Sequence, residues 1–163
     1  MSRPTLLHQN LNQTFQKDRF HPYCQNNLLQ AILEGKQLRA KQEHIQVSYE
    51  ILLPEKISID TTDLSSIFFN LLDNAIELYA SGNPEPEIRL SANISNGFLT
   101  IYMHNTKNPL QSFTHKTTKS EPGSHGYGLS IIEDICQRYN GSYQWIDHND
   151  TFDSIVLLQI KNL

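Results

Sequence analysis

One stretch of the chain, residues 63 to 79, carries two stripes of different side chains at helical spacing. The apolar stripe, which we expect to pack against a core, consists of Leu64, Phe68, Leu71, Ala75 and Tyr79. The polar stripe, on another face, consists of Ser66, Asn70, Asp73, Asn74 and Glu77. Asn and Asp are unfavourable inside helices because their side chains compete for backbone hydrogen bonds. Their concentration on one face therefore indicates a specific role.

Amide and carboxylate oxygens at this spacing suit a hydrated Mg²⁺ and the phosphates that it bridges, since Mg²⁺ prefers oxygen ligands and keeps some of its waters. The plainer interpretation is a half-buried helix whose Asn side chains bond to neighbouring loops. A second segment favours the first interpretation. Residues 124 to 129, Ser-His-Gly-Tyr-Gly-Leu, open an apolar-periodic helix. Backbone N–H groups and the helix dipole at such a start attract phosphate oxygens, so the two segments together predict a nucleotide site.

Both segments resemble motifs of the GHKL ATPases, the superfamily of DNA gyrase, MutL and the histidine kinases. Residues 70 to 77, Asn-Leu-Leu-Asp-Asn-Ala-Ile-Glu, resemble the N box, and residues 125 to 129 resemble the second glycine box. The resemblance is strongest to the ATP-binding domain of peptide-sensing histidine kinases of the accessory-gene-regulator type. It extends over about residues 24 to 160 and takes in residues 26 to 33, Lys36, and residues 117 to 119.

This resemblance implies roles for two asparagines. Asn74 takes the position of the N-box asparagine that ligates Mg²⁺, and Asn70 lies one turn before it. In the hydrolytic branches of the superfamily the earlier position is Glu, which activates water. An amide cannot take up a proton near neutral pH. The sequence therefore favours a kinase, which keeps the γ-phosphate for a protein nucleophile, over a free-running ATPase.

The resemblance also implies which residues contact ATP and which act in catalysis. The implied catalytic residues are Asn70, Asn74 and Lys119. The implied cofactor-binding residues are Asp73, Asn74, Asn105, Thr118, Lys119, His125, Gly126, Tyr127, Gly128 and Leu129. Asn105 stands where the family has Asp after a strand, and the glycines of the first glycine box are absent. An Asn can accept from the adenine amino group and donate to a ring nitrogen, but without charge assistance. Taken alone, Lys119 could equally be a solvated loop lysine.

Composition excludes several other classes of protein. The chain has 163 residues, 38% of them hydrophobic and 18% charged, which suits one domain with a core. A net charge of −4 with scattered basic residues argues against a nucleic-acid partner. Two cysteines give neither a disulfide framework nor a metal site, which fits a reducing cytoplasm. No apolar run has the length of a membrane span, so we expect no direct membrane contact by this chain.

Residues 1 to 22 are expected to be a helical leader, a remnant of a dimerisation helix, ahead of a catalytic domain at residues 23 to 163. Leu7, Leu11 and Phe15 form a narrow apolar stripe at i, i+4 and i+8. Such a stripe suits a two-helix or dimer contact, and a frayed leader that packs on the domain is the alternative. His8 lacks the acidic neighbour of the family's phospho-accepting motif, so we expect the acceptor histidine outside this chain.

Patterning and breakers predict the order of the elements. The expected elements are a helix from Asn26 or Asn27 to about Gln42, a strand at 45 to 52, a central helix capped by Thr61, Thr62 or Asp63 and stopped at 81 to 84, a hairpin at 86 to 104 turning at Asn96-Gly97, a helix at 129 to 139 stopped by Asn140-Gly141, and two strands around Asn149-Asp150. This order predicts an α/β two-layer sandwich, with a mixed, mostly antiparallel sheet and helices on one face. The resemblance implies the same fold, the Bergerat type.

Residues 105 to 124 show little regular patterning. Lys107, Lys116 and Lys119 make this stretch basic beside the glycine motif. Long loops inside compact domains are commonly functional, so we expect an active-site lid whose lysines gain partners from the ligand. A loop without function is the alternative.

The leading hypothesis is the ATP-binding domain of a sensor histidine kinase, with ATP and Mg²⁺ as cofactors. It would be the cytoplasmic portion of a membrane-anchored kinase. Its partners would be the histidine-bearing dimerisation helix of the same kinase and a response regulator. A free-standing GHKL regulator of the anti-sigma type is one alternative, although such proteins typically keep Glu at the position of Asn70. A nucleotide-binding module that has lost catalysis is the other, because the first glycine box is incomplete.

Overall fold

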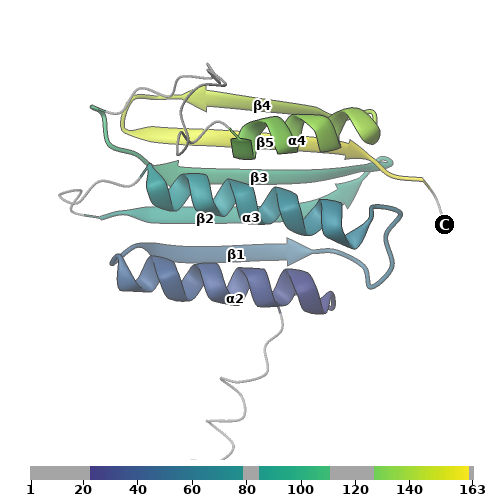
Figure 1. The fold of residues 1–163 in the computed structure, drawn as a ribbon, viewed down its shortest axis with the longest axis horizontal. Coiled ribbons are helices and arrows are strands. Elements are labelled where there is room, and N and C mark those ends of the chain that lie inside the picture. The colour runs from purple at the N-terminus through teal and green to yellow at the C-terminus, as the bar shows by residue number, and fades with distance from the viewer. Residues whose placement is uncertain (1–22, 79–84, 111–126, 162–163) are drawn as a thin grey trace, which may run out of the picture.

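The computed structural model describes residues 23 to 78, 85 to 110 and 127 to 161. A five-stranded sheet has the order β1-β2-β3-β5-β4, and in the described ranges three helices lie side by side over one of its faces (Figure 1). The elements are α2 (Asn27–Gln42), β1 (Gln46–Leu52), α3 (Thr61–Glu77), β2 (Glu87–Ser95), β3 (Phe98–Thr106), α4 (Tyr127–Arg138), β4 (Ser142–Asp147) and β5 (Thr151–Gln159). β1 pairs with β2 in parallel, and the other pairs are antiparallel. The predicted two-layer sandwich is confirmed.

Helix α3 is the middle helix of the layer, with α2 on one side and α4 on the other (Figure 1). The four described members of the predicted apolar stripe are all buried, and so are Ile67, Leu72 and Ile76. The buried face is wider than predicted because α3 contacts the sheet and both neighbouring helices. The predicted cap was wrong: Asp60 is the N-cap and accepts from the Thr62 N–H at 2.8 Å.

The hairpin of β2 and β3 turns at the predicted dipeptide. Asn96 and Gly97 have φ values of 53° and 79°. Two consecutive residues with positive φ are typical of the type I′ turn, whose twist matches the flanking strands. β3 continues to Thr106, two residues beyond the predicted end, so Asn105 belongs to the sheet and pairs with Phe152 of β5.

The dipeptide Asn140-Gly141 ends α4 as predicted, but its two residues have different tasks. Asn140 takes the left-handed conformation, with a φ of 48°. Gly141 is needed for space, because a Cβ there would lie 1.8 Å from the Leu157 carbonyl oxygen. The turn at Asn149 has a φ of 78°, again a conformation that Asn tolerates better than most residues.

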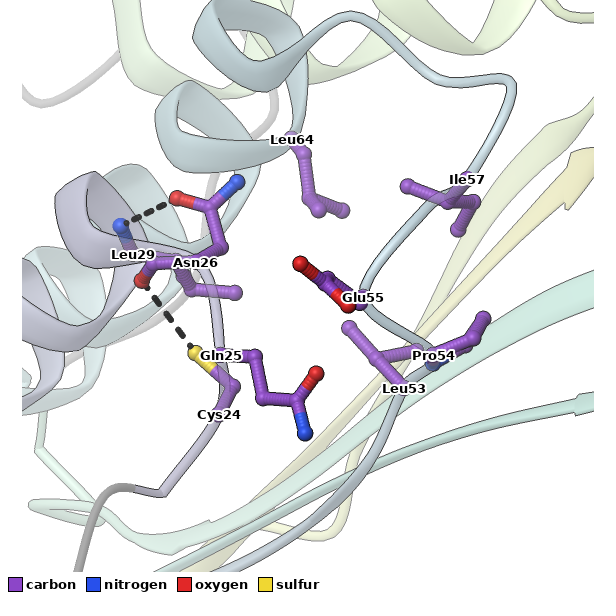
Figure 2. Close-up of a pocket in the computed structure, with 9 residues that line it drawn as sticks. All are labelled: Cys24, Gln25, Asn26, Leu29, Leu53, Pro54, Glu55, Ile57 and Leu64. Carbon is purple, nitrogen blue, oxygen red and sulfur yellow. Dashed lines mark hydrogen bonds between the residues drawn. The ribbon is translucent and has the colours of Figure 1, made fainter.

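Helix α2 begins beside the start of α3. Asn26 caps α2 by accepting from the Leu29 N–H at 3.0 Å, and its amide donates to the Thr61 hydroxyl at 3.3 Å. Figure 2 shows this cap next to a small hollow that also contacts Leu53 and Ile57. The hollow has about 10 Å³ of free space, enough for roughly one water and no larger ligand. Lys36 and Asp73 are in contact further along the two helices, so α2 and α3 run in the same direction.

Several predicted features lie outside the described residues. They are the leader at residues 1 to 22, Tyr79 of the apolar stripe, the helix stop at 81 to 84, and residues 111 to 124 of the loop. Among the residues that the structure does describe, no helix is both long and apolar enough to cross a bilayer.

Candidate functional site

The side chain of Asn70 on α3 lies against the first turn of α4. Its Nδ2 donates to the Ser66 carbonyl at 2.7 Å, which fixes the direction of the carboxamide. A Cβ added to Gly128 would stand 2.7 Å from Asn70 Oδ1. A side chain at residue 128 would therefore displace the Asn70 carboxamide from this position. The structure thus brings together the two motifs that the sequence analysis linked.

The N-terminus of α4 is suited to an anion. The first turn contains no acidic residue that would offset the partial positive charge of the helix start. The first N–H groups of a helix have no partner within it and can bind phosphate oxygens. Leu129 is buried in the core, so any contact that it makes with a ligand there would come from its backbone.

Asn105 is fully buried on the side of β3 that faces the helices. Its Nδ2 donates to the Thr106 carbonyl at 3.2 Å, whereas its Oδ1 has no hydrogen-bond partner among the described residues. A buried acceptor without a partner destabilises a fold by about 1 to 3 kcal/mol. Such an atom suits a hydrogen-bond donor on a ligand, and the substitution of Asn for the family's Asp keeps that acceptor.

Asn74 lies one turn after Asn70 on α3 and is half-buried. Its carbonyl accepts from the Leu78 N–H at 2.9 Å, so the helix continues past it and holds its position firmly. In the described ranges no group of three His, Cys, Asp or Glu side chains could hold a metal ion. A cation at Asn74 would therefore draw most of its ligands from a bound phosphate and water.

Asp73 points to α2. Its Oδ1 accepts from Lys36 Nζ at 2.6 Å and Arg39 Nη1 at 2.5 Å, and the Lys36 ammonium also lies 3.7 Å from the centre of the Phe69 ring. Burial opposes ionisation of Asp73, but the bonds and charges of the two cations outweigh it and lower the pKa of this carboxyl. The cofactor role of Asp73 stays a prediction, and its observed contacts are those of an anchor between α2 and α3.

Lys107 does not belong to a basic loop, and this part of the prediction was wrong. The side chain is 2% exposed, and its Nζ donates to the Asn149 carbonyl at 3.0 Å and lies 3.2 Å from Asp147 Oδ1. These partners come from the last residue of β4 and from the turn between β4 and β5. Lys107 therefore has its partners without any ligand. No local pattern indicates these contacts, because the partners lie about forty residues away in the chain.

Asp63 is a structural residue that the sequence analysis took for a cap. Its Oδ1 pairs with Arg138 Nη2 at 3.0 Å, and its Oδ2 accepts from the Tyr139 hydroxyl at 2.7 Å. Both partners stand at the C-terminal end of α4. This cluster and the approach of Gly128 to Asn70 fix α4 against α3 at its two ends.

The remaining predicted site residues belong to the stretch that precedes α4 and to its first residue. Thr118, Lys119, His125 and Gly126 lie outside the described residues, and of Tyr127 only the backbone is described, as the first residue of α4. Their roles stay predictions.

Comparison with solved structures shows the same fold in several histidine kinases. The Acinetobacter baumannii histidine kinase AdeS is 13% identical, with a TM-score of 0.64 over 83% of this chain and 64% of the AdeS chain. The catalytic domain of histidine kinase ThkA is 18% identical, with a TM-score of 0.63 over 82% of this chain and 90% of that domain. Full-length ShkA in complex with AMPPNP is 17% identical, with a TM-score of 0.67 over 85% of this chain and 30% of ShkA.

Sequence comparison identifies the family. No curated protein matches the chain significantly. The family model described as a GHKL domain matches residues 59 to 161, which is well over half of the chain. That range contains Asn70, Asn105 and Gly128, the residues whose geometry defines the candidate site. With its fold and its sequence in agreement, the chain belongs to the GHKL domain family.

Proposed function

We propose that the chain is the ATP-binding catalytic domain of a two-component sensor histidine kinase. It binds ATP with Mg²⁺ and passes the γ-phosphoryl group to a histidine outside this chain. The observation that carries the proposal is the packing of the Asn70 carboxamide on Gly128, because it unites an amide-bearing helix face with a helix start suited to phosphate. The motif resemblance supports the peptide-sensing, quorum-sensing type in particular.

Two parts of the site would share the nucleotide. The unpaired Oδ1 of Asn105 would accept from the adenine amino group, which removes the penalty of a buried acceptor. The start of α4 would bind phosphate oxygens. Mg²⁺, held by Asn74 and phosphate oxygens, would neutralise charge on the transferred group. One of the structural relatives, ShkA, has been solved in complex with AMPPNP, which supports a nucleotide in this fold.

Transfer rather than hydrolysis follows from the chemistry of Asn70. A carboxamide is neutral and is no base for water, and the Nδ2 of Asn70 is already used in the bond to the Ser66 carbonyl. Phosphoryl transfer depends mainly on positioning and charge stabilisation, so a bound γ-phosphate without an in-line nucleophile is retained. The nucleophile would come from the dimerisation helix of the same kinase, and a response regulator would receive the group next. The domain would act in the cytoplasm, as part of a membrane-anchored protein.

A nucleotide-binding module without transfer activity is the second candidate. The observation in its favour is the neutral Asn105, which makes an uncharged bond to adenine where the family's Asp would make a stronger one. Both candidates bind nucleotide, and only the kinase delivers phosphate to a histidine.

Nucleotide binding is tested by calorimetric titration of the whole chain with AMPPNP and Mg²⁺. Asn74→Ala is expected to weaken binding at least tenfold without lowering the melting temperature, because it removes a half-buried polar group rather than core volume. Asn93→Ala, an exposed asparagine on β2, is the matched control and should bind like the unchanged chain. Equal affinity of the Asn74 and Asn93 variants in Mg²⁺ would remove Asn74 from the site.

Transfer is tested with γ-labelled ATP and the acceptor helix of the kinase, supplied as a separate polypeptide at high concentration. We expect label on that helix, in an acid-labile form typical of phosphohistidine, and little release of free phosphate. Tight binding with no labelling would favour the module without transfer activity. Rapid phosphate release would show that a base for water exists and that the role given to Asn70 is wrong.

A further inference from the structure

A lysine stands in the buried stripe of α2. The buried residues of this helix are Leu29, Leu33, Lys36 and Ala40, which recur at helical spacing. Lys36 is only 8% exposed, and lysine is almost never buried unless it is paired. An apolar residue here would pack without burial of a charge, and buried ion pairs can often be replaced by apolar residues without loss of stability. The stability of the core alone therefore does not account for Lys36.

The ammonium group of Lys36 contacts two residues of α3 that lie one turn apart. Its Nζ donates to Asp73 Oδ1 at 2.6 Å and lies 3.7 Å from the centre of the Phe69 ring. Phe69 and Asp73 are four residues apart, so they share one face of α3. Phe69 immediately precedes Asn70, and Asp73 immediately precedes Asn74. One side chain of α2 is thus tied to both turns of α3 that carry the asparagines of the candidate site.

These two contacts fix the rotation of α3 about its own axis. Successive residues of a helix are about 100° apart around the axis, so the face that Lys36 contacts turns together with the face that carries the asparagines. On the α4 side, the Asn70 carboxamide lies against Gly128. The middle helix of the layer is therefore held from both neighbouring helices (Figure 1). A contact with Asp73 alone would leave α3 free to pivot about one point, and the contact with Phe69 removes that freedom.

We propose that Lys36 is a positioning residue for the Mg²⁺ and nucleotide site, because its hold on α3 sets the direction in which Asn70 and Asn74 present their carboxamides. This inference rests on the proposed function, in which Asn74 and phosphate oxygens hold Mg²⁺. The side chain of Lys36 is 10% exposed and its ammonium is occupied by Asp73 and Phe69, so it acts through the asparagines and not on the ligand. Mg²⁺ demands near-ideal octahedral geometry, whereas a phosphate at a helix start can shift among several N–H groups. Loss of Lys36 should therefore weaken the Mg²⁺-dependent part of nucleotide binding most.

Arg39 provides a matched comparison within the same cluster. Its Nη1 donates to the same oxygen of Asp73 at 2.5 Å, but its side chain is 43% exposed, and the contact with the Phe69 ring belongs to Lys36. Lys36→Met and Arg39→Met therefore remove the same charge from the same carboxylate. A general loss of positive charge near the phosphates would make Mg²⁺ more valuable to nucleotide binding. A loss of positioning has the opposite sign, because it makes Mg²⁺ less valuable.

Calorimetric titration of the full chain with AMPPNP, once with Mg²⁺ and once with EDTA, tests this role. The quantity to compare is the Mg²⁺ gain, defined as the dissociation constant in EDTA divided by that in Mg²⁺. Changes to groups that orient metal ligands typically weaken metal binding about 10- to 100-fold, so Lys36→Met should lower the Mg²⁺ gain about tenfold. Its affinity in EDTA should stay within about twofold of the unchanged chain, since the start of α4 and Asn105 are untouched. Arg39→Met should keep the Mg²⁺ gain within about twofold, because an exposed ion pair contributes little.

A Mg²⁺ gain that is kept or raised in Lys36→Met would overturn the positioning role, and so would an equal fall in Arg39→Met. The melting temperature of each variant without ligand establishes that the domain is folded. If Lys36→Met alone is too unstable to titrate, the double variant with Asp73→Asn removes the carboxylate that has lost its partner, and a full Mg²⁺ gain in that variant would equally overturn the role. An unchanged chain without any Mg²⁺ gain would instead contradict the proposed Mg²⁺ site itself, and the role of Lys36 with it.

Discussion

The Asn70 carboxamide occupies the space that a side chain at position 128 would need, with Oδ1 only 2.7 Å from a Cβ built there. Gly128→Ala is therefore expected to displace the carboxamide. In a helix, Ala is more favourable than Gly by about 1 kcal/mol, whereas overpacking costs about 1 to 3 kcal/mol. The free energy of unfolding should change little, while affinity for AMPPNP with Mg²⁺ should fall about tenfold.

Gly35→Ala in α2 is the matched control, because a Cβ there meets no atom within 4 Å. It should gain about 1 kcal/mol of stability and leave nucleotide affinity unchanged. Denaturant titration and calorimetry measure the two quantities. Unchanged affinity of Gly128→Ala would show that the carboxamide can move without loss of the site.

Asn105→Leu should separate function from stability. The change removes the buried oxygen that has no partner and keeps the volume, so we expect a gain of about 1 kcal/mol in the free energy of unfolding. The same change should weaken nucleotide binding, because the acceptor for the adenine amino group is lost. Ser65→Ala removes another buried oxygen that has no partner among the described residues, and it should leave nucleotide affinity unchanged. A stable Asn105→Leu variant with full affinity would contradict the adenine contact.

Asp73→Asn is expected to destabilise the domain by about 2 to 3 kcal/mol, since the Lys36 ammonium is largely buried and would lose its countercharge. The double variant with Lys36→Met should recover much of this loss. Glu87→Gln, in the exposed pair with Arg89, is the control and should change stability by less than about 1 kcal/mol. A loss in Asp73→Asn no larger than in the control would show that the pair does not anchor α2.

The Asp73 pair also has a defined pH dependence. The pKa of Asp73 is lowered in the folded state. The stability that this carboxylate contributes is therefore fully present above its unfolded pKa of about 4, and it is lost as the pH falls through the folded pKa. The difference between the unchanged chain and Asp73→Asn should therefore be constant from pH 5 to 8 and shrink below about pH 4. Urea unfolding midpoints of both proteins at pH 7 and pH 3 measure this difference in stability. A difference of the same size at the two pH values would refute the role given to the Asp73 carboxylate.

Two lysines of the same sequence region should behave in opposite ways. Lys107→Met removes buried hydrogen bonds and should lower the free energy of unfolding by about 2 kcal/mol, with nucleotide affinity retained. Lys119→Ala should lower affinity and leave stability unchanged, as the resemblance implies for a phosphate contact. Thermal melts with and without AMPPNP measure both effects. If Lys107→Met lost nucleotide affinity at unchanged stability, Lys107 would be a ligand contact and not a structural residue.

The features that sequence predicted correctly depend on neighbouring residues. Asn96-Gly97 specifies its own turn, Asn26 caps the helix that follows it, and the alternation in β2 and β3 marks which side chains face the helices. The nearness of Asn70 and Gly128 was predicted from the phosphate-binding chemistry that the two segments share and from the motif resemblance, because no local pattern relates residues so far apart in the chain.

The errors involve partners that are distant in the chain. The pattern around Asp63 predicts a cap, yet its partners stand at the C-terminal end of α4. The pattern around Lys107 predicts a loop lysine, yet its partners stand at the end of β4 and in the turn that follows. A charged residue in a sequence gives no sign of which distant group neutralises it. The sequence likewise contains Asn105 but gives no sign that the side-chain oxygen of this residue is buried without a hydrogen-bond partner.

The single parallel pairing in the sheet has a consequence for the order of folding. β2 with β3 and β4 with β5 are joined by short turns, whereas β1 reaches β2 only after the whole of α3 has been placed. Contacts between distant residues form late because loop closure is entropically unfavourable. We expect α2 and β1 to join last and to open first, as a unit that exchanges its amide hydrogens before β3 and β5 do. Faster exchange in β3 than in β1 would contradict this order.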